Sequence, residues 1–242
     1  MGLLLLILIL RSKSWKRLLF SVNVRMPGDW RYWGRHNRCQ NNLQRRMDMN
    51  EEIKKKQTEL KGEIYEDLKK YLTWDDYIKL TQWLNEREFW LAPASTKYHG
   101  AHPCGLAEHS IAVAKNLVSL TEKLGLKWAN PRSPYLIGLL HDVCKTDQYK
   151  LDNTYMIDLV TTGYHYSYRT DSIFSHHGEK SICMLASVIT LTEEEVACIR
   201  WHMGAYETDT NEWKYYGNAI AKYPNVLWTH TADMMASHID GV

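Results

Sequence analysis

The chain has 242 residues, of which 45% are hydrophobic and 24% are charged. This composition is ordinary for a globular protein that is long enough to bury a core. The formal net charge of +2 hides an asymmetry, because residues 1–49 hold ten Lys and Arg against two Asp, whereas the remaining residues hold 20 basic and 26 acidic side chains. The mildly acidic body argues against an extended nucleic acid as a partner.

The first 48 residues differ in composition from the rest and are predicted to form a basic and apolar leader. The opening run MGLLLLILIL is too short to span a bilayer. Positive charge follows this run instead of preceding it, so it does not resemble a secretory signal. The basic stretch that follows shows neither a helical nor a strand period. Three interpretations remain: a membrane-surface anchor, a disordered tail, or a gene start placed too early, with translation beginning at Met49. We favour the last and expect no membrane partner.

Residues 49–90 are predicted to form N-terminal helices that pack on the core of the main domain. Thr73 and Asp76 have the spacing of a helix cap and its first turn, and predict a second helix that runs to about Arg87. The first helix is indicated by apolar residues at close to helical spacing: Ile53, Leu60, Ile64, Leu68 and Leu72.

Residues 91–242 are predicted to form a mainly α domain with one small β-hairpin near 147–174, where Tyr, Thr and turn residues are frequent. A loop rich in Gly and Pro precedes the first helix of this domain. The predicted helices are 105–124, ended by Gly125; one opened by Ser133 and Pro134 that ends in HDVCK; about 177–189; one with the capping box Thr192-x-x-Glu195 that carries Trp201 and His202; and one from Pro224 that holds Asp233.

Several of these helices place an ionisable group on the face that also carries apolar residues. His109, His202 and Asp233 lie at helical spacing from apolar neighbours, and His141 and Asp142 close an apolar helix. A single inward histidine is usually a hydrogen-bonded core residue. Three histidines and two aspartates buried together would leave several desolvated polar groups, a cost that a divalent metal ion removes. Helical bundles build metal sites from facing helices in this way.

The order H…HD…H…H…D resembles the HD superfamily of metal-dependent phosphohydrolases. The resemblance covers roughly residues 90–240. The GLxEH and LLHDxxK blocks are similar to those in the HD domain of certain 3′→5′ exoribonucleases. Taken together, the blocks of this sequence are most similar to those of small stand-alone HD proteins of bacteria and phages. The blocks that carry it are STKYHGAHPCGLAEHS, GLLHDVCKTDQY, SHHGEKSI, IRWHMGAYE and LWTHTADMMAS.

The resemblance implies roles for individual residues. His109, His141, Asp142 and Asp233 match the ligands of a first metal, and Asp142 would bridge to a second metal held by His177 and His202. His177 is preferred to His176 because HGEKS resembles the third block of the family. Lys145 matches the lysine of HDxGK, although Cys144 replaces the usual glycine. Asp142 and Lys145 are the expected catalytic residues, and Lys145, His102, His176 and Tyr149 are the candidates for substrate binding.

The sequence therefore predicts a metal-dependent phosphomonoesterase or phosphodiesterase that acts on a nucleotide or short oligonucleotide through a metal-activated water. The mixed imidazole and carboxylate ligands suit one or two ions such as Mn²⁺ or Fe²⁺. Two alternatives are a di-iron oxygenase on the same scaffold and a non-catalytic module that senses a nucleotide. The five scattered cysteines, an odd number without a C-x-x-C pair, indicate a reducing compartment, so we expect a cytoplasmic protein.

Overall fold

The structure is a computed structural model that describes residues 30–151, 164–174, 176–204 and 212–242, with side chains from residue 50 onwards. The chain divides into two compact units, residues 1–44 and 45–242. The opening apolar run of the predicted leader lies outside the described residues. The part of the leader that is described is helical, because helix α2 extends over Trp30–Tyr71.

Residues 30–48 are thus helical in the structure although their sequence shows no helical period of apolar residues. This stretch contains five Arg and two Gln, which are good helix formers. Extending an existing helix also avoids the cost of nucleating a new one. Further along α2, Ile64 and Leu68 are fully buried, as the spacing of apolar residues predicts.

Helix α3 (Trp74–Glu86) begins and ends with identifiable caps. The hydroxyl oxygen of Thr73 accepts a hydrogen bond from the backbone N–H of Asp76 at 3.3 Å, which confirms the predicted cap. At the other end, the N–H of Phe89 bonds the carbonyl of Leu84 and the N–H of Glu88 bonds that of Asn85, both at 3.2 Å. These two bonds form a Schellman motif, which places Glu88 in the left-handed region at φ 54°.

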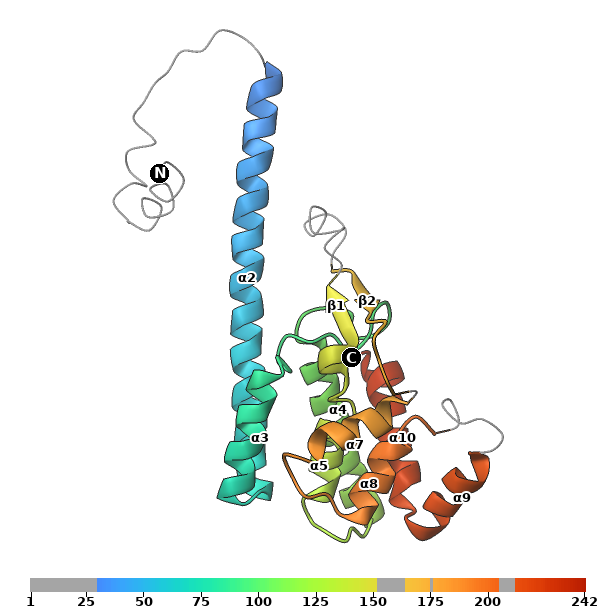
Figure 1. Ribbon diagram of the computed structural model, residues 1–242. Helices are drawn as coiled ribbons and strands as arrows, with labels where there is room; N and C mark the ends of the chain where they lie inside the picture. Colours follow the sequence, from blue (N-terminus) through green and yellow to red (C-terminus); the bar gives the residue numbers. More distant parts are fainter. Residues whose placement is uncertain (1–29, 152–163, 175, 205–211) are drawn as a thin grey trace. The chain divides into compact units, whose positions relative to one another are not determined.

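The main domain is a bundle of helices joined to one small sheet (Figure 1), which confirms the predicted fold class. Helix α4 packs against α5 and α10, α10 packs against α8, and α8 packs against α7. The bounds are α4 Gly105–Leu124, α5 Ser133–Leu140, α6 Lys145–Gln148, α7 His177–Leu185, α8 Glu193–Arg200, α9 Trp213–Lys222 and α10 Asn225–Met235, followed by a π-helical turn at Ala236–Asp240.

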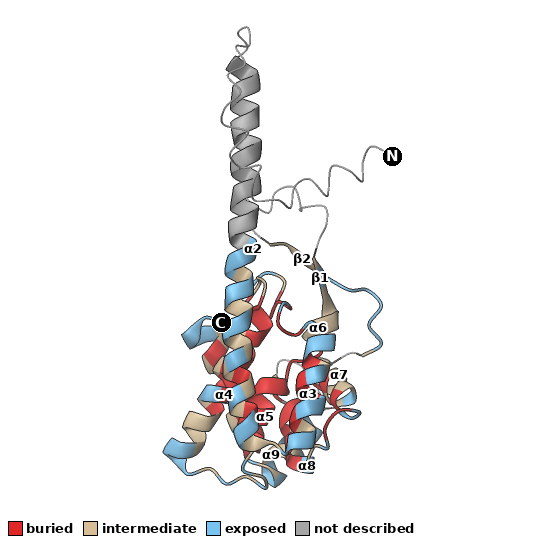
Figure 2. Cartoon of the chain, turned by 90° about the vertical axis from the view of Figure 1, so that its left-hand side faces the viewer, coloured by how far each residue is buried: buried red, intermediate tan, exposed pale blue. Residues whose placement is uncertain are grey.

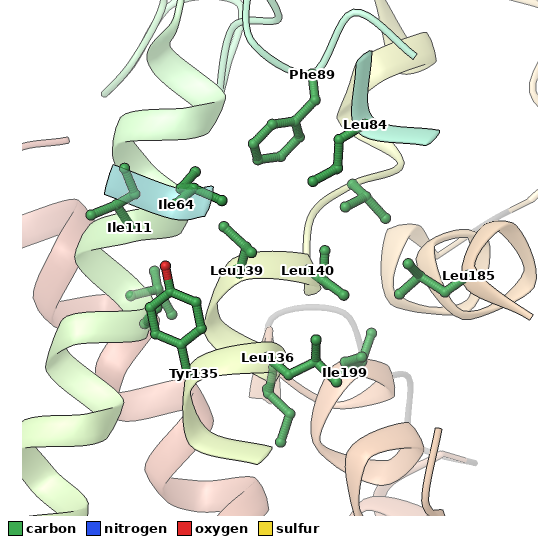
Figure 3. Close-up of a cluster of buried hydrophobic side chains, with 14 of the residues drawn as sticks. Ile64, Leu84, Phe89, Ile111, Tyr135, Leu136, Leu139, Leu140, Leu185 and Ile199 are labelled. Atoms are coloured by element: carbon green, nitrogen blue, oxygen red, sulfur yellow. The ribbon is translucent and has the colours of Figure 1, made fainter. Parts of the chain in front are cut away.

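Helix α5 lies at the centre of the hydrophobic core. Figure 3 shows Tyr135, Leu136, Leu139 and Leu140 of this helix among apolar side chains from α2, α3, α4, α7 and α8, and Figure 2 shows buried residues concentrated around α4 and α5. All eight residues of α5 are buried. Helix α5 comes very close to α4, because a Cβ added at Gly138 would lie only 2.4 Å from the Cα of Ala114.

Three predicted helix ends are corrected by the structure. Helix α5 ends at Leu140, before the HDVCK residues, and α8 ends at Arg200, before His202. The side chain of Ser133 does not cap α5 and instead donates to the buried carboxylate of Glu195 at 2.9 Å. Helix α7 ends at Leu185, four residues earlier than expected, and α9 was not predicted.

The predicted hairpin is present as strands β1 (Tyr149–Leu151) and β2 (Tyr166–Tyr168). They pair antiparallel, with Tyr149 opposite Tyr168 and Leu151 opposite Tyr166. The rings of Tyr149 and Tyr168 lie edge to face with centroids 5.1 Å apart. No helix in the described ranges combines the length and apolar character needed to cross a bilayer.

Candidate metal centre

Five buried side chains meet where α4, α5, α8 and α10 pack together. His109 comes from the second turn of α4, and Asp233 comes from the last turns of α10. His141 and Asp142 form the turn after α5, and His202 lies in the turn after α8. The exposed fraction of these five residues ranges from 0% to 6%. The hydrophobic core thus holds a dense group of ionisable atoms.

The atoms of this cluster converge on a common region. The Nε2 atom of His109 lies 3.1 Å from Oδ1 of Asp233, and Nε2 of His141 lies 3.3 Å from Oδ2 of Asp142. On the other side, Nε2 of His202 lies 3.5 Å from Oδ1 of Asp142. Two groups of potential ligand atoms, each within 4.8 Å of one another, share His141: His109, His141 and Asp233; and His141, Asp142 and His202.

The opposite ring nitrogen of each histidine is held by a backbone carbonyl. Nδ1 of His141 lies 2.8 Å from the carbonyl oxygen of Gly138, and Nδ1 of His202 lies 2.7 Å from that of Ile199. Nδ1 of His109 lies 3.0 Å from the main-chain oxygen of Val242. Because a carbonyl only accepts, each Nδ1 carries the proton and each Nε2 presents a lone pair. This is the arrangement by which proteins orient histidine ligands of metal ions.

The inner atoms of the cluster lack hydrogen bonds. Nε2 of His109, His141 and His202 and Oδ1 of Asp142 are buried and have no hydrogen-bond partner in the described part of the chain. Leaving several buried polar atoms unpaired is costly, and a divalent cation bonded to them removes that cost. Imidazole nitrogens and carboxylate oxygens are suitable donors for such an ion. The residues present therefore fit a metal.

A comparison with family models finds the HD domain over residues 106–235, which is more than half of the chain. The chain belongs to the HD domain family. No curated protein and no solved structure matches it. HD domains form a superfamily of metal-dependent hydrolases, and the matched region contains all five residues of the cluster.

Lys145 contacts the HD pair directly. Its ammonium lies 2.6 Å from Oδ2 of Asp142, and its side chain is only 11% exposed. Burial acts to raise the pKa of Asp142, but Lys145 and the neighbouring histidines outweigh it and hold that pKa well below its usual range. Burial acts in the opposite sense on Lys145, yet Asp142 raises its pKa above the ordinary value. Asp142 is therefore a carboxylate and Lys145 an ammonium at neutral pH.

His177 and His176, the alternatives for a further ligand, occupy different environments. His177 begins α7, and its ring centroid lies 5.4 Å from that of His202, beside the cluster. It belongs to neither of the two groups of convergent ligand atoms formed by the described residues. His176 points to Glu212, with Nε2 3.5 Å from Oε1. The geometry thus sets His177, rather than His176, next to the five-residue cluster.

The other two candidates for substrate binding, His102 and Tyr149, lie in different surroundings. His102 lies 3.6 Å from the carboxylate of Glu108, which also accepts from Lys56 at 2.6 Å, so this histidine takes part in a surface ion-pair network. Tyr149 packs against Tyr168, as expected for a cross-strand pair, and with Lys145 it lines a small hollow.

His99 borders the cluster and was not singled out from the sequence. Its ring centroid lies 5.2 Å from that of His109, and its Nε2 lies 3.3 Å from Oγ of Ser237. Burial, reinforced by His109 and Lys145, lowers the pKa of His99 to about 4, so its imidazole is neutral at pH 7. The sequence offered one signal for His99, its place in the block YHGAHP. This block is a loop, so helical spacing could not show which way the side chain points.

Proposed function

We propose that this HD domain is a phosphoric ester hydrolase that acts on a small phosphorylated molecule, a nucleotide or a short oligonucleotide. One observation carries the proposal. Three buried histidines present unpaired Nε2 atoms to the same region as two aspartates, and a lysine ammonium lies 2.6 Å from one of those aspartates. This combination offers a metal-binding cluster with a positive charge beside it.

His109, His141, Asp142 and Asp233 would hold a first divalent ion, with Mn²⁺ or Fe²⁺ suited to this donor set. Such an ion, when bound, polarises a phosphoryl oxygen and lowers the pKa of a water molecule. His202 converges on the other oxygen of Asp142. Together with His177 it would complete a second site, with Asp142 shared between the two.

The residues of the chain supply positioning and charge. The backbone carbonyls bonded to Nδ1 fix the three imidazoles before any ligand arrives, so no reorganisation is needed at that step. Asp142 holds the Lys145 ammonium at the edge of the cluster. Lys145 has three N–H donors and only one is needed for Asp142, so the others can donate to a phosphate oxygen. The low exposure of both groups strengthens their electrostatic effect.

The Lys145 ammonium also helps to choose between a hydrolase and the two alternatives, a di-iron oxygenase and a nucleotide-sensing module. An anionic phosphate ester gains from a buried cation next to the metal ligands, so the Lys145 ammonium favours a phosphorylated substrate. The hydrolase is therefore the function that the site supports best. A nucleotide-sensing module would use the same contacts without turnover.

The test combines metal analysis with two assays. The purified protein should contain one to two equivalents of a transition metal, and Asp142→Ala should lose most of it. Asp240→Ala is the control, because it also removes an aspartate carboxylate, but one that is exposed, lies outside the cluster and accepts a hydrogen bond from Asn116. Phosphate release from nucleotides and short RNAs with Mn²⁺ supports the proposal. Oxygen uptake by the iron-loaded protein without phosphate release would replace it with the oxygenase, and nucleotide binding without turnover would replace it with the sensing module.

A further inference from the structure

The segment after α10, residues 236–242, reaches back to the five-residue cluster. It continues directly from the helix that carries Asp233, through the π-helical turn Ala236–Asp240. The main-chain oxygen of Val242 lies 3.0 Å from Nδ1 of the fully buried His109. The segment therefore begins shortly after one member of the cluster and contacts another.

This contact differs from those that hold the other two histidines of the cluster. Nδ1 of His141 bonds the carbonyl of Gly138, and His202 makes the same kind of bond at the end of its own helix. Each of these acceptors lies three residues earlier in the chain, so the bond forms wherever that helix end forms. The bond of His109 instead joins residues that are 133 positions apart. The orientation of His109 thus depends on a distant segment, whereas that of the other two is decided locally.

The contact with Val242 decides which ring nitrogen of His109 offers a lone pair. Nε2 of His109 lies 3.1 Å from Oδ1 of Asp233, so the imidazole has an acceptor on each side. With Val242 docked, a proton on Nε2 would leave two lone pairs facing each other at Nδ1, so the proton stays on Nδ1. Once Val242 withdraws, that penalty disappears, and a proton on Nε2 gains a strong bond to the Asp233 carboxylate. Nε2 then has no lone pair for a metal ion.

The path of the segment to His109 is set by its own backbone. The N–H groups of Gly241 and Val242 both bond the carbonyl of Ala236, which closes the turn. Gly241 occupies the left-handed region at φ 76°, and an added Cβ there would meet nothing within 4 Å. Glycine therefore suits this position because of the backbone angle and not because space is short. The position of Val242 can thus be changed through this one dihedral angle.

A second contact of the segment reaches the loop before α4. Oγ of Ser237 lies 3.3 Å from Nε2 of His99, and the ring centroid of His99 lies 5.2 Å from that of His109. The segment therefore touches both His109 and a side chain packed against it. Because both contacts come from one short segment, they form together and are lost together.

We propose that residues 236–242 are a positioning element of the metal centre, and that docking of this segment and binding of a divalent ion favour each other. Docking holds the ring proton of His109 on Nδ1, which leaves Nε2 ready for the ion. Such coupling is reciprocal, so the factor by which docking tightens ion binding equals the factor by which the ion stabilises docking. The proposal rests on the metal cluster of the proposed function, and it requires no particular reaction there.

Two substitutions of Gly241 test the proposal in the full chain. Gly241→Pro removes the N–H that bonds Ala236 and fixes φ near about −65°, so Val242 is directed away from His109. Gly241→Asn is the matched control, because asparagine tolerates the left-handed region and the open space accommodates its side chain. Long-range ¹H–¹⁵N NMR of the metal-free protein shows which ring nitrogen of each histidine carries the proton. Mn²⁺ titration followed by electron paramagnetic resonance gives the Kd.

In the wild-type protein and in Gly241→Asn, we expect His109, His141 and His202 to carry the proton on Nδ1. In Gly241→Pro, only His109 should move its proton to Nε2, and the Kd for Mn²⁺ should rise about tenfold or more, as for other losses of ligand orientation. Hydrogen exchange measures the reverse effect, since Mn²⁺ should slow the exchange of the amides of residues 236–242 by a similar factor in the wild-type protein. A general loss of structure would disturb all three histidines alike.

An unchanged His109 in Gly241→Pro would overturn the proposal, and so would equal changes at all three histidines, an unchanged Kd, or the same loss in Gly241→Asn. The result is separable from the proposed function. A protein that shows the expected differences in Mn²⁺ binding but releases no phosphate from any ester has the positioning element without the hydrolase. A protein that releases phosphate, and whose Gly241→Pro variant binds Mn²⁺ with the wild-type Kd, has the hydrolase without the positioning element.

Discussion

Substitution of Gly138 by Ala tests whether the packing of α4 on α5 sets the geometry of the metal centre. A methyl group at this position would lie 2.4 Å from the Cα of Ala114 and 2.5 Å from its nitrogen. Carbon atoms that are not bonded to each other prefer separations of about 3.5–4.0 Å. The obstacle is helix backbone, which cannot rotate away as a side chain can, so the two helices must separate by roughly 1 Å.

The separation has two measurable consequences. Overpacking of a core costs about 1–3 kcal/mol, and replacing Gly by Ala inside a helix returns about 1 kcal/mol. With the cost at its upper end, we expect a net loss of about 2 kcal/mol in the free energy of unfolding. Helix α4 carries His109, and the carbonyl of Gly138 holds His141. A displacement of this kind should weaken Mn²⁺ binding by about 10–100-fold, as for other losses of ligand orientation.

Urea unfolding of the metal-free protein measures the first effect, and Mn²⁺ titration followed by electron paramagnetic resonance measures the second. Gly62→Ala is the matched control, because Gly62 lies in α2 and an added Cβ there meets nothing within 4 Å. It should stabilise the protein by about 0.5–1 kcal/mol and leave the Kd for Mn²⁺ unchanged. If Gly138→Ala unfolds at the wild-type urea concentration and binds Mn²⁺ with the wild-type Kd, the packing of α4 on α5 does not position the ligands.

Two further predictions concern buried groups outside the metal cluster. Glu195 is fully buried and accepts from Arg132 at 3.1 Å and from Ser133 at 2.9 Å. Glu195→Ala should leave the Arg132 guanidinium with the carbonyl of Thr190 but without its carboxylate partner, and should cost about 3–5 kcal/mol by urea unfolding. Glu193→Ala, which removes an exposed carboxylate in the same turn, should leave stability nearly unchanged, and equal losses for the two variants would refute the reasoning. Burial raises the pKa of Cys104 to about 11 and those of Cys144 and Cys198 to about 12, so at pH 8 fewer than about one in a thousand of these thiols is ionised. Mass-spectrometric mapping after brief iodoacetamide treatment should therefore find the exposed Cys183 labelled and these three unlabelled, whereas rapid labelling of Cys198 would show that its surroundings open readily.

Local rules account for much of what the sequence predicts correctly. The cap at Thr73, the capping box of Thr192 and Glu195, and the Gly125 that ends α4 all depend on residues within a few positions of each other. The hairpin follows from its composition, and the mainly helical fold follows from the spacing of apolar residues. These features are visible in sequence because the interactions that produce them lie within one turn of a helix or across one pair of strands.

Predictions fail where a side chain competes locally for a helix carbonyl and where the deciding contact is distant. Helices α5 and α8 end earlier than their apolar pattern suggests, and the carbonyls of Gly138 and Ile199 accept from the imidazoles of His141 and His202. Ser133 looks like a cap but bonds Glu195, 62 residues away. His176 and His177 are adjacent in sequence, yet one lies near Glu212 and the other beside His202.

The sequence by itself determined the set of residues from which a metal centre can be built, since the spacing of His109, His202 and Asp233 places them on apolar helix faces and the HD pair follows an apolar helix. Only the tertiary structure decided how those groups meet. It holds Nδ1 of His109 on the main-chain oxygen of Val242, 133 residues away, brings Lys145 onto Asp142, and sets His99 beside the cluster. The physical reason is that helical periodicity fixes the direction of a side chain relative to its own helix, whereas the packing of helices fixes what that side chain faces.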